Sequence, residues 1–211
     1  MLLNKNKAFE LIKLLNKSIK NPKTSLKYRN KFTLLTSVVL SAQCTDVNVN
    51  NVTKNIYKKY YTPKHFADLG INKIRNLIKS IGLFNNKAKN IYFLSKILLE
   101  KYQSKVPSKF EDLISLPGVG RKTANVVLNA AFNKPTIAVD THVFRVGNRT
   151  GLSNGKNPAQ VENQLLKALS NKHLKKAHHL ILLHGRYVCK ARKPDCKKCI
   201  INKICLYKYK S

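Results

Sequence analysis

A sharp turn between two helical segments is encoded at residues 116–123, which read LPGVGRKT. The preceding residues 108–116 place apolar side chains on one face of a short helix, and residues 121–132 repeat apolar residues at the spacing of a buried helical face. Pro117 and Gly118 end the first helix, and Gly120 predicts a tight hairpin with a positive φ. Free N–H groups at the start of the second helix then form an anion site next to the hairpin. The pattern predicts two helices joined by a turn that binds phosphate.

Lys122 lies in the first turn of this second helix. The positive end of the helix dipole disfavours the protonated form of a lysine, so a neutral amine there becomes a better nucleophile. A solvated lysine in a lysine-rich chain is the alternative interpretation.

Asp140 follows an apolar segment and stands at the predicted N-cap of another helix. Capping is sufficient to explain an aspartate at this position. The functional alternative is that its carboxylate faces the same cleft as Lys122, and both roles are compatible.

The charge of the chain narrows the class of partner. Its 211 residues contain 41 Lys and Arg against 9 Asp and Glu, a formal net charge of +32. Such a field attracts polyanions, with nucleic acid as the leading candidate, and predicts steeply salt-dependent binding. Part of the lysine excess is the composition expected from an AT-rich genome. No apolar run has the length of a signal peptide or of a membrane span, so we expect a cytoplasmic, nucleoid-associated protein of bacterial type.

Helical periodicity predicts an all-α fold, because no segment alternates as a strand does. Thr45 or Asp46 can cap one helix, and Gly82 begins a turn. Apart from this capped helix and the two hairpin segments, the predicted helices cover residues 9–19, 32–43, 71–81, 87–102, 140–149, 158–169 and 174–187.

Four cysteines gather near the C-terminal end with the pattern Cys189-x6-Cys196-x2-Cys199-x5-Cys205. Clustered cysteines in a reducing compartment indicate a metal more often than disulfides. Structural zinc sites usually use two close pairs of ligands, whereas this tail has one close pair and two single cysteines. The spacing therefore favours one cubane iron–sulfur cluster over zinc, and four unliganded thiols remain the third interpretation.

Other groups near the cysteines carry less information. Arg192 and Lys193 lie in a basic loop that either approaches DNA phosphates or forms a solvated charged surface. His178, His179 and His184 lack the spacing that stacks two imidazoles on one helical face, so packing explains them better than a metal. The fifth cysteine, Cys44, is interpreted as a small packed side chain.

Together these segments resemble the helix–hairpin–helix DNA glycosylases, and within them the endonuclease III family. The resemblance covers nearly the whole chain. The matching segments are LSAQ with Thr45-Asp46, IGL at 81–83, LPGVGRKTANVVLN at 116–129, TIAVDTHVFRV at 136–146 and HGRYVCKARKPDC at 184–196, followed by Cys199 and Cys205. The visible departure is Cys44, where the family pattern has alanine.

The resemblance implies a fold of two lobes with a cleft between them. Residues 24–134 would form a helical barrel domain, and residues 1–23 with 135–211 a cluster domain. Lys122 would be the nucleophile, Asp140 the catalytic carboxylate, and Cys189, Cys196, Cys199 and Cys205 the ligands of a 4Fe–4S cluster. Gln43 and Leu83 would enter the duplex where the damaged base is flipped out. The further expected DNA contacts are Gly118, Gly120, Arg121, His142, Arg192 and Lys193.

The implied activity is that of a monomeric, bifunctional DNA glycosylase and AP lyase that removes oxidised pyrimidines from double-stranded DNA. The nearest alternative is the adenine glycosylase that acts opposite oxidised guanine, which normally lacks a lysine at the position of Lys122 and carries an extra C-terminal domain. A non-catalytic binder of DNA structures is the alternative from another class, and Lys122 and Asp140 argue against it.

Overall fold

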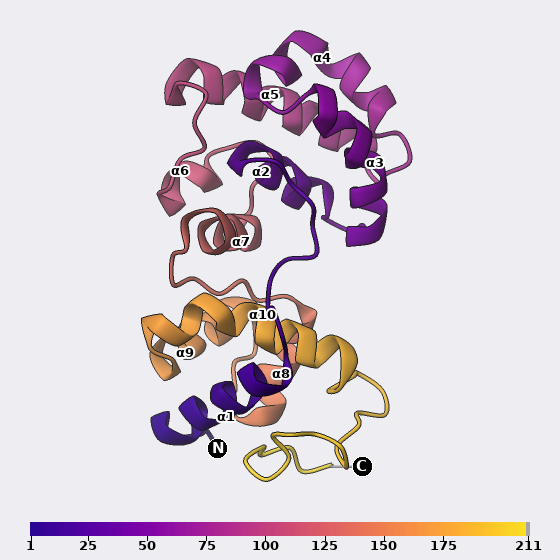
Figure 1. The fold of residues 1–211 in the computed structure, drawn as a ribbon. Coiled ribbons are helices and arrows are strands. Elements are labelled where there is room, and N and C mark those ends of the chain that lie inside the picture. The colour runs from indigo at the N-terminus through magenta and orange to yellow at the C-terminus, as the bar shows by residue number, and fades with distance from the viewer. Residues whose placement is uncertain (210–211) are drawn as a thin grey trace. The chain divides into compact units, whose positions relative to one another are not determined.

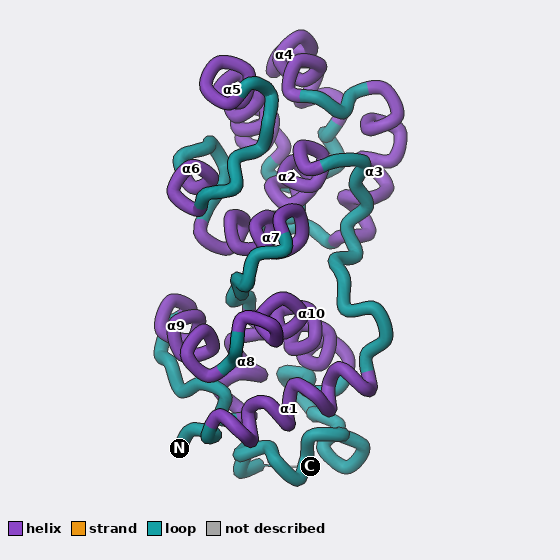
Figure 2. The backbone as a smooth tube through the Cα atoms, turned by 60° about the vertical axis from the view of Figure 1, so that its left-hand side comes forward, coloured by secondary structure: helices purple, strands orange, loops and turns teal. Residues whose placement is uncertain are grey.

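The computed structural model describes residues 1–209, which divide into two compact units (Figure 1). Unit 1 combines Met1–Lys23 with Asn133–Ser211, and unit 2 is the continuous segment Thr24–Phe132. Both ends of the chain therefore belong to unit 1. Helices and loops account for all described residues, without a strand (Figure 2), which confirms the all-α prediction.

Each unit has its own set of helices. Unit 2 contains α2 (Lys31–Leu40), α3 (Asp46–Lys59), α4 (Pro63–Leu77), α5 (Phe84–Tyr102), α6 (Phe110–Ile114) and α7 (Arg121–Phe132). Unit 1 contains α1 (Lys5–Ser18), α8 (Thr141–Thr150), α9 (Pro158–Ala168) and α10 (Asn171–Tyr187).

Helix α2 forms the centre of unit 2, since every residue after Lys31 in this helix is buried. It packs against α7, α3 and α5. Its start is fixed by a capping box, in which the Asn30 side chain accepts from the Thr33 amide and the Thr33 hydroxyl accepts from the Asn30 amide. Burial on all sides explains why the sequence of this helix is apolar without a clear stripe.

Two predicted helix boundaries in unit 2 were wrong. The helix predicted to run to Gln43 ends at Leu40, and Gln43 takes a left-handed φ of 53°. The helix predicted over residues 71–81 ends at Leu77, whereas its start directly after Gly70 matches the prediction; a further helical segment that Thr62 caps at Pro63 precedes it. Gly70, with φ 70° and ψ 164°, interrupts this helix and explains why its two halves do not share one apolar repeat.

In unit 1, α10 packs against α8 and α1 around a core that includes Leu11, Val146 and Leu180. His178 and His179 are buried in this helix. The His178 Nδ1 lies 2.9 Å from the Ala138 carbonyl oxygen, and burial lowers the pKa of His179. These two histidines are packing residues, as their spacing suggests.

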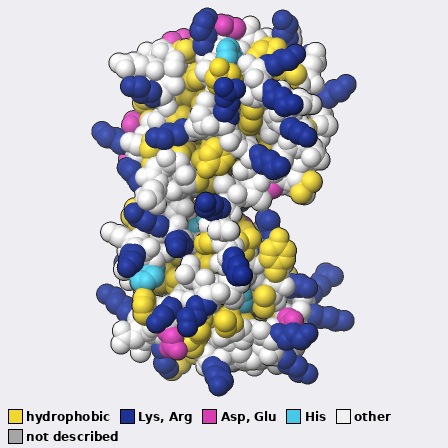
Figure 3. Space-filling model, viewed as in Figure 1, with side chains coloured by type: hydrophobic (Ala, Val, Ile, Leu, Met, Phe, Trp, Pro, Cys, Tyr) yellow, Lys and Arg dark blue, Asp and Glu magenta, His cyan; other side chains and the backbone are white. Residues whose placement is uncertain are grey.

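Basic side chains are spread over the face of both units seen in Figure 3, and acidic side chains are sparse there. No described helix combines the length and the apolar character that crossing a membrane requires.

Candidate functional site

The turn between α6 and α7 is a hydrogen-bonded hairpin. The Leu116 amide donates to the Leu113 carbonyl, and the Val119 amide donates to the Leu116 carbonyl, both at 3.1 Å. Leu116 and Val119 are buried, which fixes the hairpin to the core of unit 2. The peptide groups between them are therefore held in place by their flanking side chains.

The glycine that needs a positive φ is Gly118 and not Gly120. Gly118 has φ 77°, whereas the backbone of Gly120 does not enter the positive-φ region. A Cβ atom at Gly118 would also lie 2.8 Å from Asn90 Nδ2 and 2.9 Å from Asn90 Cβ. The prediction for Gly120 was wrong because the positive φ occurs two residues earlier, at Gly118, which packs against Asn90 of α5.

Gly120 is explained by neither conformation nor internal packing. A Cβ atom there would meet no heavy atom within 4 Å, and its carbonyl starts α7 by accepting from the Ala124 amide at 3.0 Å. Glycine without an internal reason is typical of a site where a ligand approaches the backbone. Gly120 is exposed next to the start of α7, and the positive end of a helix dipole favours an anion there.

Lys122 is the second residue of α7 and is exposed to solvent. The buried face of α7 is formed by residues such as Ala124, Val127 and Leu128. Arg121 is also exposed, and its guanidinium lies 5.2 Å from the centre of the Phe110 ring. The Lys122 amine is thus accessible to solvent two residues after Gly120, whose backbone no other described residue covers.

Asp140 caps α8, as the sequence predicts. One of its carboxylate oxygens accepts from the Val143 amide at 2.7 Å, and the side chain is half-buried. His142 is also half-buried, with its Nδ1 3.2 Å from Arg145 Nη2. Asp140 belongs to unit 1 and Lys122 to unit 2.

Gln43 and Leu83, far apart in sequence, lie on neighbouring loops of unit 2. Both are exposed residues with left-handed backbones, with φ of 53° and 59°. A Cβ atom at Gly82 would lie 3.8 Å from the Gln43 carbonyl oxygen. Asn48 joins the loops by donating from Nδ2 to the Ser80 carbonyl at 3.2 Å and to the Cys44 Sγ at 3.4 Å.

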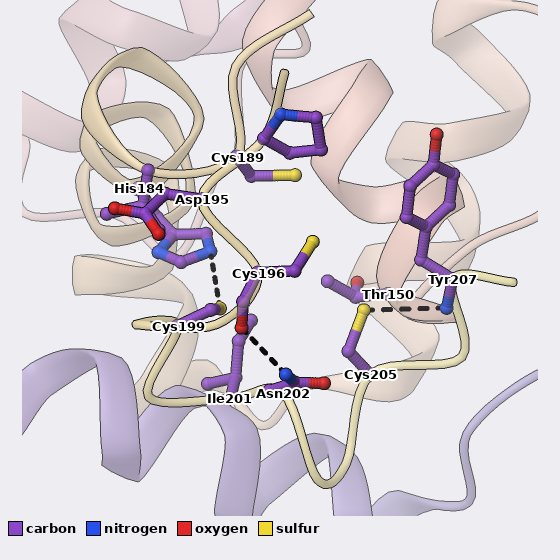
Figure 4. A pocket seen from close by; sticks show the side chains of 12 residues that line it. Thr150, His184, Cys189, Asp195, Cys196, Cys199, Ile201, Asn202, Cys205 and Tyr207 are labelled. Atoms are coloured by element: carbon purple, nitrogen blue, oxygen red, sulfur yellow. Dashed lines mark hydrogen bonds between the residues drawn. The ribbon is translucent and has the colours of Figure 1, made fainter. Parts of the chain in front are cut away.

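The four clustered cysteines surround one pocket in unit 1 (Figure 4). Its other lining residues include His184, Ile201 and Tyr207. Cys205 is fixed by the Tyr207 amide, which lies 3.5 Å from its Sγ. The loop that follows α10 therefore folds back so that four thiols face a common space.

Cys199 and His184 are in direct contact in this pocket, with the Cys199 Sγ 3.6 Å from the His184 Nε2. Burial raises the pKa of the Cys199 thiol, and the neighbouring Cys205, Cys189 and Cys196 raise it further. Burial also lowers the pKa of His184 to about 4, so the imidazole is neutral near pH 7. Several thiolates this close repel one another and are stabilised together only by a bound cationic centre.

Arg145 of α8 holds the start of the cysteine loop. It donates from Nε to the Cys189 carbonyl at 3.1 Å and from Nη2 to the Gly185 carbonyl at 2.8 Å. Gly185 lies in the last turn of α10, where carbonyls lack partners within the helix. Arg145 therefore joins α8 both to the end of α10 and to the first cysteine of the set.

Arg149 of α8 holds the next residues of the same loop. It donates to the Lys190 and Ala191 carbonyls at 2.6 and 2.9 Å. Arg192 and Lys193 follow directly in the chain, and both are exposed. The basic loop is thus fixed to α8 through the backbone that precedes its two exposed cations, Arg192 and Lys193.

The four thiols form a donor set that a metal centre could use, because all of them line the same pocket. Among residues 1–209, no group of three or more His, Cys, Asp or Glu side chains is arranged to hold a single metal ion. Four sulfurs nevertheless line the same pocket. A tetrahedral zinc ion needs all four sulfurs at about 2.3 Å, whereas a cubane cluster takes its ligands at the corners of a larger body. Four thiolates are the donors that either centre takes, so the residues present fit an iron–sulfur cluster.

Comparisons with known proteins agree with this arrangement. Residues 36–171 match the family model of the HhH-GPD superfamily base excision DNA repair protein. Endonuclease III of Rickettsia conorii is 57% identical over 202 residues, which cover 96% of this chain and 95% of that protein. The chain belongs to the endonuclease III family of this superfamily. Endonuclease III of Escherichia coli is 50% identical over 208 residues, which cover 99% of this chain and 99% of that protein.

Solved structures of endonuclease III share the fold. A trapped covalent intermediate of endonuclease III with DNA, in an estranged-adenine complex, matches with a TM-score of 0.90 and 42% identity, covering 97% of this chain and 96% of that one. A non-covalent endonuclease III–DNA complex matches with a TM-score of 0.89 at the same identity and coverage. The family resemblance read from the sequence is thereby confirmed, and the chain is a base excision repair DNA glycosylase.

Sequence reasoning missed three residues that support these sites. Arg149 and Arg145 anchor the cysteine loop from α8, and Lys87 contacts the loop of Gln43. Segment 136–146 draws attention through Asp140, whereas its arginine carries no signal of its own. In a chain with 41 Lys and Arg, a basic residue that binds backbone carbonyls looks like any other.

Proposed function

We propose that this enzyme removes oxidised pyrimidines from double-stranded DNA as a bifunctional glycosylase and AP lyase. The observation that carries the proposal is the exposed Lys122, which follows the open backbone of Gly120 at the start of α7. The hairpin amides would bind backbone phosphate without reading sequence. This grip would hold the DNA strand beside the lysine amine.

A base inside the stack shields its sugar, so the damaged nucleotide must first leave the helix. The neutral amine of Lys122 then attacks C1′, the bond from C1′ to the base breaks, and the base leaves with a proton. Asp140 stabilises the positive charge that develops on the sugar and assists the proton transfers. The bond from C1′ to O4′ then breaks and O4′ takes a proton, which leaves Lys122 joined to C1′ as a Schiff base; the iminium acidifies a 2′ proton, and removal of this proton expels the 3′ phosphate by β-elimination.

Gln43 and Leu83 would fill the space that the extruded nucleotide leaves. Both are exposed, and their loops lie side by side in unit 2. Inserted side chains offset part of the cost of unstacking, which is a few kcal/mol. Arg121, His142, Arg192 and Lys193 would contact phosphates around this point, together with Gly118 and Gly120.

Cys189, Cys196, Cys199 and Cys205 would hold a 4Fe–4S cluster. The cluster would supply a structural cross-link for the loop after α10, because four thiolates then share one rigid centre. Arg149 and Arg145 fix the same loop from α8. In this proposal residues 24–134 act as the helical barrel domain, and residues 1–23 with 135–211 as the cluster domain. The enzyme would act as a monomer in the cytoplasm, on the DNA of the nucleoid.

Borohydride trapping tests the proposal. The purified protein is incubated with a duplex that carries one oxidised pyrimidine, and borohydride reduces any Schiff base to a stable protein–DNA adduct. We expect an adduct with the wild type and with Lys172→Gln, an exposed lysine of α10 that serves as the control, but none with Lys122→Gln. An adduct with Lys122→Gln would show that another amine is the nucleophile. A non-catalytic binder would shift the duplex in a gel without adduct or strand cleavage.

A further inference from the structure

Lys87 of α5 is almost completely buried, with 4% of its surface exposed. Its Nζ donates to the Leu40 carbonyl at 2.9 Å and to the Ala42 carbonyl at 2.6 Å. A buried ammonium group is costly unless it is paired or hydrogen-bonded, and here two carbonyls receive it. A buried lysine at this position therefore indicates a specific structural or functional role for its ammonium group.

The two carbonyls belong to Leu40, the last residue of α2, and to Ala42 in the turn that follows it. The last carbonyls of a helix lack partners within it and favour a positive charge, but the last turn of α2 contains no basic residue. Lys87 supplies that charge from another helix. It thereby contacts the chain where α2 ends and the loop of Gln43 begins.

The contact with Ala42 acts directly on Gln43. The carbonyl of Ala42 and the amide of Gln43 belong to the same planar peptide group, so holding one fixes the other. Gln43 has a φ of 53°, a left-handed conformation that costs energy for a residue with a Cβ atom. Lys87 therefore stabilises a strained backbone at the residue that the proposed function inserts into DNA.

The backbone of Lys87 contacts the second inserted residue. Its amide donates to the Leu83 carbonyl at 3.1 Å, in the first turn of α5. Leu83 has a φ of 59°, no side chain caps the helix there, and its side chain is 54% exposed. This ordinary hydrogen bond of the first turn of α5 places Lys87 one turn from Leu83, while its Nζ binds the carbonyl of the peptide before Gln43.

Asn48 of α3 provides a second connection between the same loops. Its Nδ2 lies 3.2 Å from the Ser80 carbonyl oxygen and 3.4 Å from the Cys44 Sγ. Cys44 follows Gln43, and Ser80 lies three residues before Leu83. Lys87 and Asn48 together link the loop of Gln43 to the loop of Leu83 on the surface of unit 2.

We propose that Lys87, supported by Asn48, is a positioning residue that presets Gln43 and Leu83 for insertion into the DNA duplex. This inference rests on the proposed function, because it assumes that the two side chains replace an extruded nucleotide. Without Lys87 the loops must be ordered by the DNA itself, which weakens every step that requires extrusion. The rates of steps that need no nucleotide extrusion fall much less when Lys87 is replaced.

The test compares an abasic site in a duplex with the same site in a single strand, where no stacked partner has to be displaced. Lys87→Met keeps the aliphatic chain and removes the donors, and Gln43→Ala removes an inserted side chain. We expect Lys87→Met to lower the ratio of duplex to single-strand cleavage rates by about tenfold or more. Asn48→Ala should lower the same ratio by a smaller factor, and it remains informative if Lys87→Met folds poorly.

A double mutant separates positioning from general stability. If Lys87 acts through Gln43, Lys87→Met combined with Gln43→Ala lowers the ratio less than the product of the two single effects. Fluorescence of 2-aminopurine opposite the abasic site, measured with all DNA bound, should rise less with Lys87→Met than with the wild type. This signal reports unstacking and is independent of turnover.

Equal losses on duplex and single strand would overturn the inference, because they indicate a purely structural role for Lys87. Fully multiplicative effects of Lys87→Met and Gln43→Ala would overturn it as well. Failure of the proposed function looks different: the wild type would then form no borohydride adduct with either substrate.

Discussion

Arg149 contacts Cys189 directly, with its Nη1 3.7 Å from the Sγ. The same guanidinium donates to the carbonyls of Lys190 and Ala191, the two residues that follow this cysteine. It also lies 4.6 Å from the centre of the Tyr207 ring, beyond the last cysteine of the set. One side chain of α8 therefore touches both ends of the cysteine loop, so a helix of the core and the proposed cluster stabilise the same segment.

Replacing Arg149 should shorten the lifetime of the cluster. Lysine keeps the charge in Arg149→Lys but cannot donate in a planar fork to two carbonyls. We expect the visible absorbance of the cluster to decay several-fold faster during mild acidification, and the protein to lose about 1–3 kcal/mol of stability. Arg192→Lys, an exposed residue of the same loop, is the matched control. Equal decay rates for the two variants would contradict a role for Arg149.

The two hairpin glycines should respond differently to alanine. Gly118→Ala forces a Cβ onto a φ of 77° and within 2.8 Å of Asn90, so we expect a loss of about 1–3 kcal/mol in the free energy of unfolding. Gly120→Ala has open space and should change stability by no more than about 0.5 kcal/mol. If Gly120 lies against phosphate, this variant still binds abasic DNA more weakly. Thermal unfolding and gel shifts measure the two effects, and unchanged affinity of Gly120→Ala would remove this glycine from the DNA contacts.

Two substitutions separate the capping role of Asp140 from its proposed catalytic role. Asparagine can still accept from the Val143 amide, so Asp140→Asn should retain the stability of the wild type, whereas Asp140→Ala should lose about 1 kcal/mol. Both variants should lose base-excision activity, because neither carries a carboxylate. Melting temperatures and single-turnover rates provide the measurements. Near-normal rates for Asp140→Asn would leave the capping role alone.

Tyr57 predicts a loss of stability at high pH. Its hydroxyl lies 2.9 Å from Thr36 Oγ1 and 2.8 Å from Ser37 Oγ, and burial raises its pKa from 10.0 to about 12. As the pH rises, Tyr57 therefore loses its hydroxyl proton in the unfolded chain before it does so in the folded protein. The contribution of this hydroxyl to the free energy of unfolding is complete below pH 10 and is lost as the pH rises toward 12. The loss amounts to about 3 kcal/mol at most. Denaturant unfolding of Tyr57→Phe should lack this loss, and parallel pH profiles of the two proteins would contradict the prediction.

The sequence by itself determined the helices, helix caps and motif spacings, because each of these depends on residues close together in the chain. Apolar spacing predicted α7 from Arg121 to Phe132, and a short polar side chain before a helix predicted the Asp140 cap. The order of hairpin, lysine, aspartate and cysteines was sufficient to identify the family. These features are local because helix periods, caps and ligand spacings are set within a few residues.

Tertiary structure alone decided which glycine turns the hairpin and which cations act on the backbone. Position 118 has no room for a side chain because Asn90 of another helix packs against it, and no local pattern contains that contact. Lys87 and Arg149 bind carbonyls that lie 47 and 41 residues away in sequence. Carbonyl groups are identical at every residue, so the sequence cannot show which of them a lysine or arginine will meet; folding brings them together, and only the folded chain reveals the pair.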